Sequence, residues 1–242
     1  MKKKLQSSWA DTRLLFRSVP AVMTTLFVVS VVIMNILANK TIYQSDLIGV
    51  DGGILVSWLS FLCMDVLTKA FGPGAATKIS LFALGVNLFV CVLFYVVSSI
   101  PTPWEDFSEF NHVIGGTWFV LLCSGVAFIT SAVVNNFLNW GIGRLFRRNP
   151  DGRLAYVTRS YVSTFIGQFV DNLVFASLLF MVFAPIYWDF SWTFVQCVGC
   201  AVLGAVLELL MEVIFSPIGY RVLRRWEKEG VGDAYRKGRT LS

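Results

Sequence analysis

Six long apolar runs constrain this chain more strongly than any other feature. Each has about 20 residues or more, which is the length a helix needs to cross the hydrocarbon core of a bilayer. They lie at residues 19–39, 53–71, 78–99, 116–140, 159–184 and 192–218. Hydrophobic residues make up 56% of the 242 residues and charged residues only 14%, a balance typical of membrane proteins. The sequence therefore predicts an all-α integral membrane bundle of six transmembrane helices.

The basic residues predict how the bundle is oriented. Of the 20 Lys and Arg residues, only Lys40 falls on one side of the six-span arrangement, and all the others fall on the opposite side. By the positive-inside rule, both termini are then cytoplasmic. This gives an N-terminal arm at 1–18, a transmembrane domain at 19–218 and a basic tail at 219–242. Because the basic residues flank apolar spans, the net charge of +5 does not indicate nucleic acid binding.

Two acids inside the sixth apolar run are costly unless something compensates their charge. Glu208 and Glu212 lie four residues apart, so a helix places both on one face. An ionised side chain at the bilayer centre costs about 2.5–3.5 kcal/mol on insertion scales. A structural role, in which each carboxylate is tied to a neighbouring helix, is the alternative for a single acid. Two acids on one face, with further acids elsewhere, favour a binding or transport site.

Other predicted spans also carry polar residues at helical spacing. Asp65 precedes Lys69 by one turn, so a self-neutralising ion pair is the alternative to a pocket role for this acid. Buried amides such as Asn35 also serve as contacts between membrane helices. A shared central pocket explains the whole set most economically. The candidate substrate-binding residues are Asn35, Asp65, Asn136, Asn139, Gln168, Asp171, Asn172, Glu208 and Glu212.

Carboxylates and amides beside many aromatic side chains suit a flat, nitrogen-rich ring. A carboxylate accepts two N–H donors from a guanine-like edge, and aromatic faces stack on the ring. An enzyme is disfavoured because the sequence has no HExxH or GxSxG motif and its sole histidine, His112, lies in a predicted loop. We expect no cofactor and no metal. Cys197 and Cys200 form a lone C-x-x-C without a nearby histidine, which favours a packing role.

Small residues near the start of the sixth span would let another helix approach closely. They are Gly199, Ala201, Gly204 and Ala205. The contact lies either within the chain or between two copies in a homodimer, and the sequence leaves both open.

Four segments together resemble the queuosine precursor transporter family, also called the vitamin uptake transporter (VUT) family. They are NILANK, SFLCMDVLTKAFG, STFIGQFVDN and MEVIFSPIGYRVL, and the resemblance runs from about residue 30 to 226. It implies a bacterial inner-membrane importer of 7-cyano-7-deazaguanine, 7-aminomethyl-7-deazaguanine or queuine. It also implies a fold similar to the substrate-binding subunits of energy-coupling-factor transporters.

The resemblance assigns site residues position by position. The family's polar motif positions correspond to Asp65, Gln168, Asp171, Asn172 and Glu212. Two positions depart from the family pattern: Lys69 stands where many members have Glu, and Glu208 stands where Lys is common. These departures bear on which substrate is carried more than on transport itself.

Three functional hypotheses follow from the sequence. The first is a standalone importer of a queuosine precursor, with proton coupling through the paired glutamates as a further hypothesis. The second is a membrane subunit that binds a related vitamin or nucleobase and requires an ATPase partner. The third, least favoured, is a structural or enzymatic membrane protein. The expected partners are a small-molecule deazaguanine and the lipid bilayer.

Overall fold

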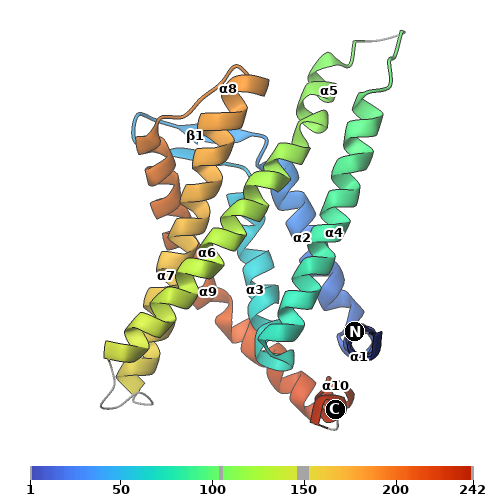
Figure 1. The fold of residues 1–242 in the computed structure, drawn as a ribbon. Coiled ribbons are helices and arrows are strands. Elements are labelled where there is room, and N and C mark those ends of the chain that lie inside the picture. Colours follow the sequence, from blue (N-terminus) through green and yellow to red (C-terminus); the bar gives the residue numbers. More distant parts are fainter. Residues whose placement is uncertain (1, 104–105, 146–152, 241–242) are drawn as a thin grey trace. The chain divides into compact units, whose positions relative to one another are not determined.

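The fold is almost entirely helical (Figure 1). The computed structural model describes residues 2–103, 106–145 and 153–240. The elements are α1 (Lys2–Ser18), α2 (Ala21–Leu37), β1 (Thr41–Gln44), β2 (Gly49–Asp51), α3 (Ile54–Phe71), α4 (Pro73–Ser98), α5 (Ser108–Gly115), α6 (Thr117–Leu145), α7 (Arg153–Ser177), the π-helix η1 (Leu178–Phe183), α8 (Ala184–Tyr187), α9 (Phe194–Glu229) and α10 (Asp233–Thr240).

Five helical stretches in the described part of the chain are long and apolar enough to cross a membrane. They are Ile54–Phe71, Pro73–Ser98, Ser108–Ser131, Phe165–Tyr187 and Phe194–Phe215. A sixth is obtained when the bent pair Trp9–Ser18 and Ala21–Leu37 is taken as one span. The predicted all-α membrane bundle is confirmed, with five to six candidate spans.

The N-terminal arm predicted at 1–18 is a helix, and the first span is shorter than the predicted 19–39. α1 ends at Ser18 and α2 begins at Ala21, and the two helices are bent by 101°. Pro20 between them lacks a backbone N–H and disfavours helical geometry at Val19. The proline therefore explains why the helix breaks here.

A short β-hairpin follows the first span, and the sequence analysis did not predict it. β1 and β2 pair antiparallel, with Gln44 opposite Gly49. Gln196 in the first turn of α9 donates from Nε2 to the carbonyl oxygen of Ser45 at 2.6 Å. A Cβ at Gly49 would lie 2.6 Å from the indole ring of Trp192, so only glycine allows this approach. The hairpin is thus held against the start of α9.

The chain divides into two compact units, each with its own hydrophobic core. Unit 1 comprises Met1–Ile33, Val56–Phe89 and Met211–Ser242, and unit 2 comprises Met34–Leu55 and Val90–Leu210. The core of unit 1 joins side chains of α1, α2, α3, α4, α9 and α10. The core of unit 2 joins side chains of α6, α7, η1, α8 and α9 with Ala38 and Trp192.

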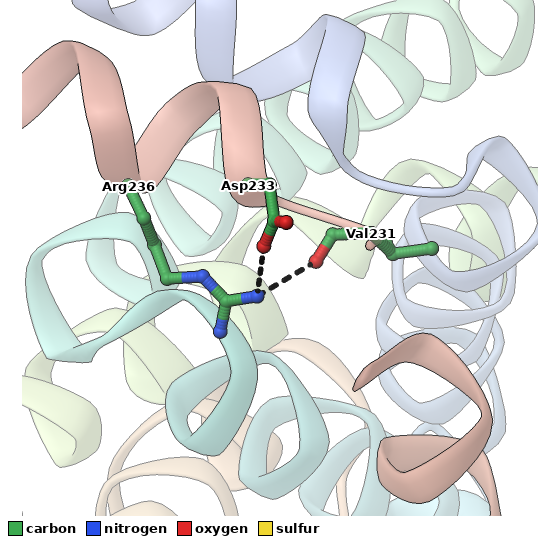
Figure 2. Close-up of polar contacts among 3 residues, drawn as sticks. All are labelled: Val231, Asp233 and Arg236. Atoms are coloured by element: carbon green, nitrogen blue, oxygen red, sulfur yellow. Dashed lines mark hydrogen bonds and ion pairs between the residues drawn. The ribbon is translucent and has the colours of Figure 1, made fainter. Parts of the chain in front are cut away.

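Glycines with positive φ shape two turns of unit 1. Gly72, with a φ of 86°, separates α3 from α4, as the Gly-Pro-Gly sequence at 72–74 predicts. Gly230 and Gly232 join α9 to α10 with φ of 66° and 86°. A Cβ at Gly232 would lie 2.7 Å from the Phe71 ring. At the start of α10, the guanidinium of Arg236 donates to the Asp233 carboxylate at 2.8 Å and to the Val231 carbonyl at 3.2 Å (Figure 2).

Candidate functional site

A strip of polar side chains on α7 forms the centre of the candidate site in unit 2. Gln168, Asp171 and Asn172 all belong to α7. Their spacing of three and four residues places them side by side on the helix surface. All three side chains are partly buried, and α7 packs along α6 in the same unit (Figure 1). The strip therefore lies against protein over part of its surface.

Asp171 has a polar partner on the neighbouring helix. Ser131 of α6 donates from Oγ to Oδ1 of Asp171 at 2.9 Å. Among the residues that the structure describes, no Lys or Arg forms an ion pair with this acid. A carboxylate has about four lone-pair sites, so a single hydroxyl leaves most of its acceptor capacity open. Asp171 can therefore accept further N–H donors.

Asn172 packs against α9 at a position without a side chain. A Cβ at Gly204 would lie 2.7 Å from Nδ2 of Asn172. Nδ2 of Asn172 and Oε1 of Gln168 are buried and find no hydrogen-bond partner in the described part of the chain. Leaving a buried amide group unsatisfied costs about 1–3 kcal/mol. The strip thus presents one donor and one acceptor, both buried, beside the Asp171 carboxylate.

Two further predicted site residues lie in unit 2. Glu208, one turn after Gly204 on α9, is 5% exposed. Asn35 on α2 is 2% exposed, and its Nδ2 finds no partner among the described residues. One turn later, Asn39 donates to Oγ1 of Thr117 at 3.3 Å. The turn that follows α2 thereby contacts the start of α6, an interhelical role that is common for buried amides.

Asp65 belongs to unit 1 and has a partner on its own helix. Lys69 donates from Nζ to Oδ2 of Asp65 at 2.5 Å. The Asp65 side chain is 39% exposed and that of Lys69 is 56% exposed. The predicted acid-then-base pair is confirmed, and it neutralises Asp65 without help from another helix.

Three predicted site residues cannot be placed in the same way. The side chains of Asn136, Asn139 and Glu212 lie outside the described residues. Their proposed roles stay predictions.

The small residues of the sixth span make contacts within the chain. An added Cβ at Gly199 would clash with the Leu47 carbonyl oxygen of the hairpin loop, and Gly204 contacts Asn172 as described above. Both contacts lie within unit 2. Cys197 and Cys200 lie in the hydrophobic core of the same unit, in agreement with the predicted packing role.

Asp51 is a buried acid outside the spans. It lies in β2, is 7% exposed, and its Oδ1 accepts from the backbone N–H of Gly53 at 2.7 Å. Burial raises the pKa of Asp51 to about 6, although hydrogen bonds from the backbone oppose this rise. This carboxyl group caps the turn that leads into α3.

An aromatic cleft occurs in unit 2, apart from the polar strip. It has a volume of about 480 Å³ and is lined by Tyr95, Trp118 and Tyr187. Sixteen residues separate Asp171 from Tyr187, which is about 24 Å of helix. Trp and Tyr gather at membrane–water interfaces, and this cleft matches that pattern.

Sequence reasoning did not assign Ser131 or Gly204 to the site. Ser131 is one of several polar residues in its span, and nothing in the sequence tells which of them faces α7. Gly204 was predicted only as a small residue that lets another helix approach closely. Their contacts with Asp171 and Asn172 depend on how α6 and α9 are rotated about their axes.

Comparison with known protein families identifies the family to which this chain belongs. Residues 51–222 match the family described as "Putative vitamin uptake transporter", which covers more than half of the chain. The chain belongs to this vitamin uptake transporter family. The match confirms the resemblance noted from the sequence motifs. No curated protein and no solved structure matches the chain.

Membership of the vitamin uptake transporter family agrees with the helical spans. The matched range begins at Asp51 and ends at Val222. It therefore includes the polar strip of α7, its contacts on α6 and α9, and the Asp65–Lys69 pair. The chain is a multi-pass membrane protein of a transporter family.

Proposed function

We propose that this chain imports a queuosine precursor across a bacterial inner membrane. The substrate would be 7-cyano-7-deazaguanine, 7-aminomethyl-7-deazaguanine or queuine. The observation that carries the proposal is the polar strip of α7, where the Asp171 carboxylate lies beside two buried amide groups that lack described partners. Family membership supports transport, and the strip supports the class of substrate.

The chemistry of the strip fits a guanine-like edge. Such an edge offers a ring N–H and an exocyclic amine, and a carboxylate accepts both. We assign this acceptor role to Asp171 or Glu212. The Nδ2 donor of Asn172 and the Oε1 acceptor of Gln168 could then pair with the carbonyl and remaining N–H groups of the ring. Asn35, Asn136 and Asn139, which belong to the same unit as the strip, remain candidate contacts within this proposal.

Proton coupling is the second part of the proposal. Glu208 is a buried carboxyl group one helical turn from Gly204, which contacts Asn172. An acid in this position can take up a proton on one side of the membrane and release it on the other. Glu208→Gln should leave substrate affinity within about twofold of the parent and abolish the response of uptake to an imposed pH gradient. Affinity that falls together with uptake would assign Glu208 to substrate binding instead.

Uptake by the purified chain alone tests the proposed function. The chain is reconstituted into liposomes without any ATPase, and entry of radiolabelled 7-cyano-7-deazaguanine is measured with and without an inward proton gradient. Unlabelled deazaguanines should compete, whereas riboflavin, thiamine and biotin should not. Uptake that requires a co-reconstituted ATPase would favour the alternative subunit function. Competition by a vitamin but not by deazaguanines would overturn the substrate assignment.

A further inference from the structure

The first helix lies across the direction of the second. α1 and α2 both contribute to unit 1, and the angle between them is 101°. α2 consists of apolar residues and Ser, Thr and Asn, without any charged side chain. If α2 crosses the bilayer near its normal, α1 runs close to the plane of the membrane surface.

One face of α1 is fixed against unit 1. Leu15 is fully buried in the core of that unit. Asp11 forms an ion pair with Lys78 of α4, and Phe16 makes an edge contact with Phe82 at a ring-centroid distance of 4.9 Å. α1 also packs against α10. These contacts determine which residues of α1 point away from the protein.

The face of α1 opposite Leu15 carries an aromatic ring and two cations. Trp9 is 73% exposed, and Arg13 and Arg17 are exposed. Their spacing of four residues places them on one stripe of the helix. Among the residues that the structure describes, no carboxylate lies within ion-pair distance of either guanidinium. Both charges are therefore available to an anionic partner.

The start of α2 locates this stripe relative to the hydrocarbon. Exposed apolar side chains run along α2 directly after the bend, at Val22, Leu26, Val29 and Ile33. The hydrocarbon core would therefore begin near Val22, three residues after α1 connects through Val19. α1 is then at the depth of the lipid headgroups, where tryptophan and arginine side chains are favoured.

The arginine of α10 provides a contrast within the same unit. The Arg236 guanidinium is held by Asp233 and by the Val231 carbonyl (Figure 2). Its charge is already compensated, which leaves it less able to bind an external anion. The two arginines of α1 differ from it in this respect.

We propose that the stripe formed by Trp9, Arg13 and Arg17 lies at the membrane–water interface and binds the phosphate groups of anionic phospholipids. The guanidinium fork matches phosphate oxygens with two parallel hydrogen bonds. The indole ring of Trp9 places its apolar body toward the acyl chains and its N–H toward the headgroups. Each Arg near an anionic membrane surface adds about 1 kcal/mol of attraction, and a helix with basic residues and Trp is suited to lie in the interface.

Lipid binding by the purified full-length chain tests the proposal. Fluorescent phosphatidylglycerol and phosphatidylcholine are titrated into the protein in neutral detergent micelles. The parent should prefer phosphatidylglycerol, and the double variant Arg13→Gln/Arg17→Gln should bind it about 20- to 30-fold more weakly. The matched control Arg221→Gln/Lys228→Gln removes two exposed cations from α9 and should retain the preference. Circular dichroism checks that the variants keep their helix content.

Two outcomes of the lipid titration would overturn the proposal. One is equal binding of both lipids by the parent. The other is an equal loss of binding in the α1 variant and the α9 control, which would show a general effect of net charge.

A measurement of depth separates lipid from a soluble protein partner. A nitroxide attached at Trp9→Cys in bilayers containing phosphatidylglycerol should be at headgroup depth. Free exposure to an aqueous relaxing agent would show that the stripe faces the solvent and that the lipid assignment is wrong.

Discussion

Asp65 and Asp171 are both acids in membrane-spanning helices, and they are compensated in different ways. Asp65 has Lys69 one turn away on the same helix at 2.5 Å. Asp171 has only a hydroxyl from another helix, that of Ser131 at 2.9 Å, among the described residues. The first acid is neutralised locally and needs nothing more. The second keeps most of its acceptor capacity, and its neighbours include buried amide atoms without described partners.

This difference suggests how to separate structural acids from binding acids in such a protein. A lysine four residues after an acid supplies the missing charge within one helix. An acid paired only with a neutral donor is costly in a low-dielectric environment, and a cationic or N–H-rich ligand can reduce that cost. We therefore expect the two acids to respond differently to the same substitution.

The largest difference in substrate affinity should come from replacing each acid by its amide. Asp171→Asn turns one acceptor oxygen into a donor that faces the donors of the ligand. Losing a charge-assisted hydrogen bond of about 1.5–3 kcal/mol should weaken binding of 7-cyano-7-deazaguanine at least tenfold in titration calorimetry. Asp65→Asn should change the affinity by a few-fold at most. Equal losses in the two variants would remove the distinction.

A smaller loss of substrate affinity should follow from filling the space beside Asn172. Gly204→Ala places a Cβ 2.7 Å from Nδ2 of Asn172, and overpacking of this kind costs about 1–3 kcal/mol. We expect a lower melting temperature and an affinity reduced several-fold. The matched variant is Gly125→Ala on α6, where an added Cβ meets no atom within 4 Å. That variant should behave like the parent, and a Gly204→Ala protein with unchanged affinity would exclude Asn172 from the site.

The Ser131 hydroxyl, which is the partner of Asp171, should contribute less to substrate affinity than the acid itself. Ser131→Ala removes the hydroxyl that orients the Asp171 carboxylate but leaves the carboxylate itself, so its effect on substrate binding is indirect. Affinity should fall by about two- to tenfold, whereas Ser131→Thr keeps the hydroxyl and should preserve most of it. Fluorescence competition with a bound deazaguanine measures both variants. An Ala variant that loses more affinity than Asp171→Asn would show that Ser131 contacts the ligand directly.

The last prediction concerns Asp51, a buried acid outside the spans, and it affects stability and not substrate affinity. Its pKa is raised by burial to about 6 from an ordinary value of 3.8, so the native state binds its proton more tightly than the unfolded chain. The contribution is therefore destabilising when the group is ionised, and stability falls as the pH rises from about 4 to about 6. Asp51→Asn should remove this part of the decline, a change of a few degrees in melting temperature. A pH profile that is identical in parent and variant would contradict the assignment.

Local sequence patterns predicted the features that depend on one helix at a time. Hydropathy located the candidate spans, the spacing of Asp65 and Lys69 gave their ion pair, and Gly72 marked the turn after α3. Each depends only on residues that are near in the chain. The predicted boundary between residues 18 and 19 coincides with the bend at Pro20. The helicity of the N-terminal arm was not predicted, because the arm is polar overall.

Contacts between elements could not be predicted in the same way. The hydrogen bond from Ser131 to Asp171 joins residues 40 positions apart, and it depends on the rotation of two packed helices. Strands β1 and β2 have only four and three residues, which are too few for a clear alternating pattern. The hairpin contacts Gln196 and Trp192, which follow it by about 150 residues.

A thermodynamic cycle between Asp171 and the substrate tests the central claim most directly. Binding of 7-cyano-7-deazaguanine and of its analogue without the exocyclic amine is measured for the parent and for Asp171→Asn. If the carboxylate accepts from that amine, the parent should bind the analogue at least tenfold more weakly, and the variant should bind both ligands within about twofold. The same loss of affinity in both proteins would contradict a contact between Asp171 and the substrate.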